Sequence, residues 1–154
     1  MHETLQEASE ELKRADHLIY VSLKYTRTVD VIKNIIERLV NAYDLMAKAL
    51  LETKLDEGKI KSVPASPLER VDEVKKFYGE EGKTMENMEL YLLLRKIATA
   101  EFERSKEFRR HVTMTAKMKD GTEILVDIDK IYDYNDMVKE FFNFVASLGD
   151  KDND

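Results

Sequence analysis

Apolar residues recur at steps of three and four along the first 57 residues, a stretch that contains no glycine and no proline. In its first part, the small and apolar positions are Leu5, Ala8, Leu12, Ala15, Ile19 and Ser22. The second part repeats the pattern at Ile32, Ile36, Leu39, Tyr43, Met46 and Leu50. This spacing places each set on one face of a helix. The sequence therefore predicts two long amphipathic helices, at about residues 3–25 and 29–55, which must bury their apolar faces.

The corner between these two helices is expected at residues 26–28. Thr28 can cap the second helix with its side-chain oxygen, and Asp30 falls in the first turn, where negative charge is favoured. A single bent helix is the alternative, since no glycine or proline forces a break. We favour two antiparallel helices, because one rod would leave its apolar face uncovered within the chain.

Two further helices are predicted in the middle of the chain. Residues 66–69, Ser-Pro-Leu-Glu, have the spacing of a capping box with proline at the first helical position, and Gly79 is the expected end of this short helix. Thr84 is the expected cap of the next helix. The apolar stripe of that helix extends to Phe102, so we expect the helical conformation to continue that far.

The hydrophobic period changes from helical to alternating near residue 112, and Asp120-Gly121 lies inside the alternating region. This pattern predicts a β-hairpin at about residues 111–128. A two-residue loop would mix apolar and polar faces, whereas a three-residue loop at residues 119–121, with Gly121 left-handed, keeps one apolar face intact. The expected pairs are Val112 with Ile128, Met114 with Val126, and Ala116 with Ile124.

The last helix is predicted from about Asp129 or Asp133 to Leu148, with Gly149 ending it, and residues 150–154 are expected to form a disordered acidic tail. A two-stranded hairpin is marginal alone in water, so the last helix or a second copy of the chain must cover it. The predicted fold is a mainly α single domain, residues 1–149. It is a helical bundle with two long antiparallel N-terminal helices and one small C-terminal β-hairpin followed by a last helix.

Composition narrows the class of protein. The chain of 154 residues has no cysteine, which excludes disulfides and thiolate chemistry, and its net charge of −6 argues against a general nucleic-acid coat. No apolar run approaches the ~20 residues of a membrane span, and residues 1–4 lack the features of a secretory signal. We therefore expect a cytoplasmic location and no membrane partner. Abundant lysine and glutamate indicate a thermophilic protein.

Metal and cofactor sites are not expected. The three histidines, His2, His17 and His111, are far apart in sequence and belong to no metal-binding motif. Five scattered glycines cannot form a phosphate-binding loop. The sequence thus predicts no metal and no cofactor.

The densest basic segment contains Arg104, Lys106, Arg109, Arg110, Lys117 and Lys119. Cations are favoured at a helix C-terminus and protect an edge strand, so part of this segment has a structural explanation. The functional interpretation is a phosphate-binding patch for RNA or for an acidic protein partner. A second stripe at helical spacing can hold a nucleic-acid strand or be the solvated flank of a packed helix. Its members are Lys13, His17, Tyr20, Lys24 and Arg27.

Arg104 and His111, separated by six residues, resemble the Arg-x4-6-His element of HEPN-domain proteins, a family of helical bundles. Many members of that family are metal-independent ribonucleases that act as dimers. By this resemblance, His111 would transfer the proton of the RNA 2′-hydroxyl and Arg104 would hold the phosphate. The chain departs from the family in one respect, because the family motif lies in the helical core and His111 is expected to begin a strand.

A wider resemblance rests on residues 14–21, Arg-Ala-Asp-His-Leu-Ile-Tyr-Val, and on residues 108–110, Phe-Arg-Arg. Together with the two long helices, the hairpin and the last helix, these residues are similar to a family of short archaeal helical proteins with no established activity. The likeness spans roughly residues 12–50 and 102–146, and it implies the layout and an archaeal origin. The expected function is a non-enzymatic interaction module acting as a homodimer. The alternative is a HEPN-like ribonuclease or RNA-binding protein that uses the Arg104–His111 segment.

Overall fold

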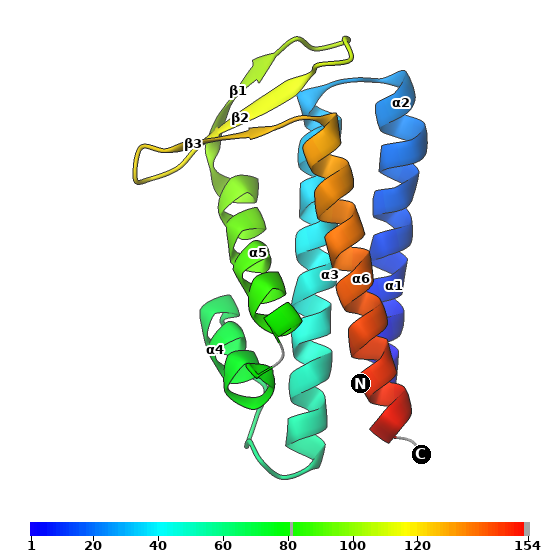
Figure 1. Ribbon diagram of the computed structural model, residues 1–154, viewed down its shortest axis with the longest axis vertical. Coiled ribbons are helices and arrows are strands. Elements are labelled where there is room, and N and C mark those ends of the chain that lie inside the picture. Colours follow the sequence, from blue (N-terminus) through cyan, green and yellow to red (C-terminus); the bar gives the residue numbers. More distant parts are fainter. Residues whose placement is uncertain (81, 153–154) are drawn as a thin grey trace.

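The computed structural model describes residues 1–80 and 82–152, with side chains described as far as residue 149. The elements are α1 (His2–His17), the π-helix η1 (Leu18–Ser22), α2 (Leu23–Tyr25), α3 (Val29–Asp56), α4 (Pro67–Tyr78), α5 (Gly82–Thr99), β1 (Glu101–Ser105), β2 (Thr113–Lys117), β3 (Glu123–Val126) and α6 (Ile128–Asp152). Figure 1 shows α1, α3, α5 and α6 along the long axis of the molecule and the strands across one end. We call this end the apical end.

The central element of the bundle is α3, which contacts α1, α4, α5 and α6 as well as η1 and β2. The stripe predicted from the sequence, from Ile32 to Leu50, is buried along its whole length. Buried side chains also lie on the other faces of this helix, among them Ile35, Ala42, Ala47 and Leu51. The exposed side of the helix is a narrow polar stripe at Asn34, Glu37 and Asn41, and the rest of the chain encloses the other faces of α3.

The two long N-terminal helices are found, but the first is not a uniform α-helix. The chain follows α1, η1 and α2 to Tyr25 and returns antiparallel as α3 (Figure 1). Thr28 caps α3 as expected, since its Oγ1 accepts the N–H of Val31 at 3.4 Å. Residues 18–22 take the π conformation, which adds one residue to a helical turn and which apolar spacing alone does not reveal.

The sheet has three antiparallel strands in the order β1-β2-β3, one more than the expected hairpin. The expectation of helix as far as Phe102 is wrong, because α5 ends at Thr99 and Phe102 lies opposite Ala116 in the ladder of β1 and β2. Phe102 fits both spacings: it follows Ala98 by four residues and also alternates with charged neighbours. The local pattern therefore could not separate helix from strand.

The predicted register of β2 and β3 is confirmed, with Met114 opposite Val126 and Ala116 opposite Ile124. Gly121 has a φ of +91°, as the three-residue turn requires. The third expected pair is not formed, because β3 ends at Val126 and the next residues begin α6. On the inner face of the hairpin, Val112, Met114, Ala116 and Val126 are buried within the chain and Ile124 is partly buried. Because β2 also packs on α3, covering this face does not require a second copy.

The expected boundaries of α4 are confirmed, since the helix begins at Pro67 after Ser66 and ends before Gly79, but the Ser66 side chain makes no capping hydrogen bond. Two other expected helix boundaries differ from the structure. Thr84 lies inside α5 rather than capping it, because the helix begins at Gly82. Helix α6 continues through Gly149 to Asp152, so residues 150–152 are helical, whereas residues 153–154 of the expected tail lie outside the described residues. A glycine costs a helix only about 1 kcal/mol, which packing can outweigh.

Buried tyrosines link α3 to its neighbours. Tyr43 donates its hydroxyl to Asn87 Oδ1 on α5 at 2.6 Å, and Tyr91 donates to Asp44 Oδ1 on α3 at the same distance. Arg70 on α4 donates to the same Asp44 oxygen at 3.0 Å. Burial raises the pKa of Tyr43 and of Tyr91 well above the ordinary value, since the charged phenolate is disfavoured away from water.

Tyr43→Phe is expected to lower the free energy of unfolding by about 1–3 kcal/mol near neutral pH, because Asn87 Oδ1 remains buried without its donor. This deficit should shrink above about pH 10. There the unfolded wild type loses the phenol proton of Tyr43 and the folded protein keeps it, so wild type loses about 1.4 kcal/mol per pH unit that the variant does not lose. Urea denaturation at neutral and alkaline pH measures the difference. A difference that does not change with pH would contradict the raised pKa.

Candidate functional site

The loop between β1 and β2, residues 106–112, crosses the N-terminal end of α3 at the apical end (Figure 1). Glu107 Oε2 accepts the N–H of Val29, the first residue of α3, at 3.0 Å. The N–H of Phe108 donates to the carbonyl oxygen of Arg27 at 2.7 Å. A carboxylate at a helix N-terminus satisfies a free N–H and interacts favourably with the helix dipole. The loop is thereby fixed to the corner between the two N-terminal helices.

Two residues of this loop have a left-handed backbone although neither is glycine. Lys106 has a φ of 53° and Phe108 a φ of 65°. This conformation costs an L-residue roughly 1–2 kcal/mol, and the Phe108 side chain, which is largely exposed, recovers little of that by burial. Strained residues cluster at functional sites, where the surrounding structure holds them in place. Phe108 therefore indicates a binding role rather than a packing role.

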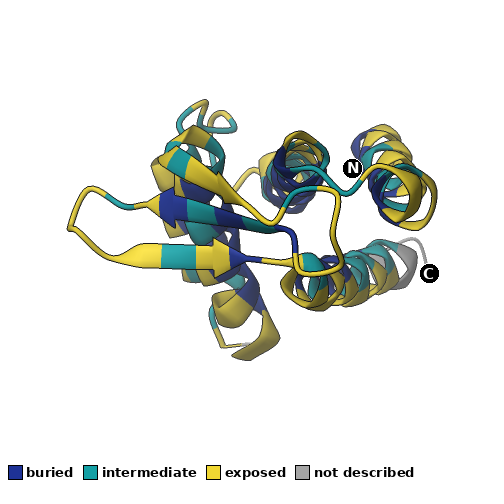
Figure 2. Cartoon of the chain, turned by 90° about the horizontal axis from the view of Figure 1, so that it is seen from above, coloured by how far each residue is buried: buried dark blue, intermediate teal, exposed yellow. Residues whose placement is uncertain are grey.

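Four aromatic side chains surround this end of the molecule. Tyr20, Tyr25, Phe108 and Tyr132 are between 37% and 79% exposed, and no other aromatic side chain of the described residues is this exposed. The ring centroids of Tyr20 and Tyr132 lie 5.9 Å apart, so the π-helix η1 and the first turns of α6 present their rings together. Figure 2, which looks onto this end, shows the loop as largely exposed and the corner as mostly of intermediate burial. π-Helical turns are frequent at functional sites.

The arginines fall into two groups. Five bind a carboxylate or lie over an aromatic ring: Arg14, Arg38, Arg70, Arg95 and Arg104. The side chains of the other three, Arg27, Arg109 and Arg110, have no hydrogen-bond or ion-pair partner in the part of the chain that the structure describes. All three lie in the corner or the loop, next to the exposed aromatic residues. We call these four aromatic residues and three arginines the apical surface.

A cavity of about 240 Å³ opens at the apical surface. It is lined by Arg27, Arg110, His111, Asp127, Ile128, Asp129 and Tyr132. The Nε atom of Arg27 is buried and has no partner among the described residues. An unsatisfied buried donor costs about 1–3 kcal/mol. We call this space the apical cavity.

The six cations of the basic segment predicted from the sequence lie in different parts of the structure. Arg109 and Arg110 belong to the apical surface, and Lys106 begins the same loop. Lys117 pairs with Glu103 at 2.7 Å across the sheet, and Lys119 lies in the turn at the opposite end of the strands (Figure 1). The six cations therefore do not form one continuous patch.

Arg104 and His111 are not brought into one cavity. Arg104 in β1 donates to Asp30 Oδ1 at 2.8 Å and lies 3.7 Å from Glu107, and its hydrogen bond lowers the pKa of Asp30. His111 lies in the loop and lines the apical cavity, which Arg104 does not line. The role of this pair in RNA cleavage stays a prediction.

Only part of the stripe predicted on the first helix belongs to the apical surface. Tyr20 and Arg27 belong to the apical surface, and Lys24 lies over the ring of Tyr25, 5.9 Å from its centroid. The earlier members, Lys13 and His17, are exposed on α1. Sequence reasoning missed Tyr25, Phe108 and Tyr132 as candidate site residues. Phe108 could have been noticed in the sequence, because it is a single aromatic residue between Lys-Glu and Arg-Arg and belongs to no apolar stripe.

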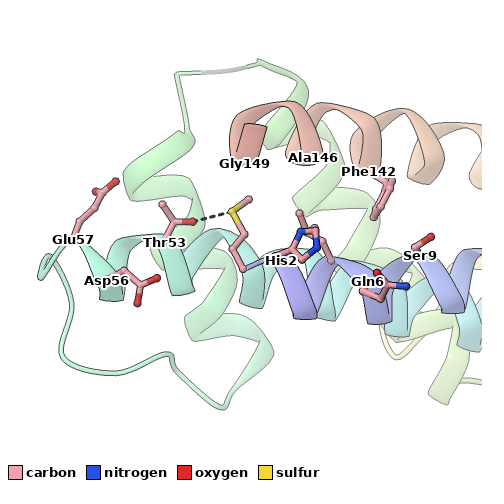
Figure 3. Close-up of a pocket in the computed structure, with 11 residues that line it drawn as sticks. His2, Gln6, Ser9, Thr53, Asp56, Glu57, Phe142, Ala146 and Gly149 are labelled. Carbon is pink, nitrogen blue, oxygen red and sulfur yellow. Dashed lines mark hydrogen bonds between the residues drawn. The ribbon is translucent and has the colours of Figure 1, made fainter. Parts of the chain in front are cut away.

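A larger cavity, of about 700 Å³, lies at the other end of the molecule between α1, α3 and α6. Figure 3 shows the hydroxyl of Thr53 donating to Met1 Sδ, at 3.0 Å, and the polar residues of α1 spread along its edge. A ligand site needs polar groups that converge, and those of this cavity do not. Among the described residues, no group of His, Asp and Glu could hold a metal ion. No helix in the described part of the chain has the length and apolar character to span a membrane.

Glu107→Ala is expected to lower the free energy of unfolding by about 1–2 kcal/mol, because the N–H of Val29 loses its acceptor at the start of the central helix. Glu107→Gln keeps an oxygen at this position and should recover most of the loss. Urea denaturation measures both variants. Glu103→Ala removes only the exposed pair with Lys117 and is the matched control, with an expected loss below about 1 kcal/mol. Equal losses in the two alanine variants would contradict a capping role for Glu107.

Comparisons of the chain with protein-family models, with curated proteins and with solved structures found no match. The function therefore has to be inferred from the residues of this chain alone. The apical surface is the part of the described structure where exposed rings, unpaired cations and a strained loop coincide.

Proposed function

We propose that this protein is a non-enzymatic interaction module that binds single-stranded RNA on its apical surface. One observation carries the proposal. The strongly exposed aromatic side chains and the unpaired arginines of the described chain lie together at one end of the bundle. Rings and guanidinium groups side by side are the combination that binds a single strand, because bases stack on the rings while cations neutralise the phosphates.

Single-stranded RNA fits this surface better than a duplex. The bases of a duplex are stacked on one another, whereas the unstacked bases of a loop or an end are free to stack on Tyr25 or Phe108. The chain as a whole carries a net charge of −6, so surfaces away from the apical end repel phosphate. Binding is therefore confined to a short stretch of the strand and depends strongly on salt.

The side-chain contacts favour binding over cleavage. Arg104 is held by two carboxylates, so it would have to break an ion pair before it could bind a scissile phosphate. The expected homodimer is compatible with the proposal, since a second copy would offer a second apical surface to the same strand. Light scattering at several concentrations measures this association directly.

Phe108→Ala and Tyr25→Ala are each expected to weaken the binding of a fluorescent oligo-uridine RNA about tenfold, the loss of one stacked base. Arg109→Gln and Arg110→Gln should weaken binding and reduce the salt slope by about 0.7 for each lost phosphate contact. Fluorescence anisotropy at low salt in the presence of EDTA measures these constants. Leu68→Ala is the matched control, because Leu68 is an exposed apolar residue on α4 and should not affect binding.

A folding control separates lost contacts from lost structure. Phe108→Gly relieves the left-handed backbone, so the variant should remain as stable as wild type or become more stable while binding is lost. Absence of binding at low salt, or an equal loss in Leu68→Ala, refutes the proposal. RNA cleavage in EDTA that is lost in the Arg104→Ala/His111→Ala double variant would replace it with the ribonuclease prediction.

A further inference from the structure

The apical cavity carries charges of both signs. Arg27 and Arg110 come from the corner and the loop, and Asp127 and Asp129 come from the start of α6. Apart from His111, the formal charges cancel. A phosphate group placed here would be attracted by the guanidinium groups and repelled by the carboxylates, so the cavity is poorly suited to phosphate.

The hydrogen-bonding groups of the cavity require a ligand with both acceptors and donors. Arginine only donates and an ionised carboxylate only accepts. The side chains of Arg27 and Arg110 both line the cavity and have no hydrogen-bond or ion-pair partner among the described residues. Asp127 uses Oδ1 to accept the N–H of Lys130 at 2.9 Å, which leaves its other oxygen for a ligand. The side chain of Asp129 has no hydrogen-bond partner within the described residues.

We infer that the apical cavity binds one guanine base of the RNA strand, an inference that rests on the proposed function. Guanine presents O6 and N7 as a pair of acceptors that suits an arginine, and its N1–H and N2 amino group form a neighbouring pair of donors that suits a carboxylate. Uracil has one ring donor, N3–H, between two carbonyl acceptors, and adenine has its N6 amino donor beside the acceptor N1, so neither base presents two adjacent donors to a carboxylate. Guanine is therefore the base whose edges complement Arg27 or Arg110 together with Asp129.

The position of Tyr132 connects the cavity to the stacking surface. Tyr132 lines the cavity, and its ring centroid lies 5.9 Å from that of Tyr20. A base that enters the cavity can thus stack on Tyr132 while its neighbours stack on the exposed rings. The volume of about 240 Å³ is smaller than the roughly 300–1,000 Å³ of sites for drug-sized ligands, so it suits a single base.

The experiment compares three short RNAs by competition anisotropy: an oligo-uridine, the same RNA with one central guanosine, and the same RNA with inosine in place of the guanosine. The guanosine RNA should bind wild type at least about tenfold more tightly than the oligo-uridine does. This is the preference over a wrong base that one bidentate pair of hydrogen bonds provides. Inosine lacks the 2-amino group and should lie between the two.

Asp129→Asn is expected to change the binding of the guanosine RNA and of the oligo-uridine in different ways. It removes a carboxylate acceptor, so the preference for guanosine should fall to less than about threefold. It also removes a negative charge, so binding of the oligo-uridine should stay equal or become tighter. Asp133→Asn is the matched control, because this exposed residue lies one turn later on α6 and does not line the cavity. The control removes the same charge and should keep the preference.

The outcomes separate the inference from the function on which it rests. Equal binding of the guanosine and uridine RNAs by wild type overturns the guanine site and leaves the RNA-binding proposal standing. Retention of the preference in Asp129→Asn, or its loss in Asp133→Asn, also overturns the guanine site. If wild type binds neither RNA, the proposed function fails and the inference fails with it.

Discussion

The burial of α3 over most of its circumference is the constraint on which the structure depends. Its buried apolar residues occur on several faces, and Asn34, Glu37 and Asn41 are left exposed, so no single partner helix can cover the apolar part. Burying one large aliphatic side chain contributes about 1.5–3 kcal/mol, and α3 carries such residues from Val29 to Leu51. Helices α1, α4, α5 and α6 supply most of the cover, and β2 supplies the remainder near the apical end. The sheet is therefore part of the enclosure of α3 and not an appendage to the bundle.

The start of α3 needs polar partners as well as apolar cover, and this requirement shapes the apical end. Thr28 accepts one N–H of the first turn and Glu107 accepts another. Arg104 bridges Glu107 and Asp30, so one cation of the basic segment is committed to holding this corner. The neighbouring Arg109 and Arg110 lie beyond the cap and have no carboxylate to bind. Strand β1 and the loop after it thus contain a structural arginine and free arginines within seven residues of sequence.

Spacing within a single element was sufficient to predict much of the fold. The stripe of α3 and the register of Met114 with Val126 follow from neighbouring residues alone, because helices and hairpins are local. Strand β1 could not be predicted in this way, since Phe102 satisfies both periods and only the partner strand decides between them. The candidate site was predicted in part. A basic segment is visible in the sequence, but which of its arginines lack a carboxylate depends on residues from distant segments, as the hydrogen bond from Arg104 to Asp30 shows.

The contacts that hold the start of α3 also order the loop that carries part of the apical surface, which would favour the proposed binding. Phe108 keeps an unfavourable backbone conformation because its N–H is bonded to Arg27 and the preceding Glu107 is bonded to Val29. A flexible loop would lose conformational freedom each time a ligand ordered it, and that loss would weaken binding. Here the loop is ordered during folding, by hydrogen bonds that also stabilise the central helix. The strain at residues 106 and 108 is offset by helix capping, and the exposed ring is presented in a fixed position.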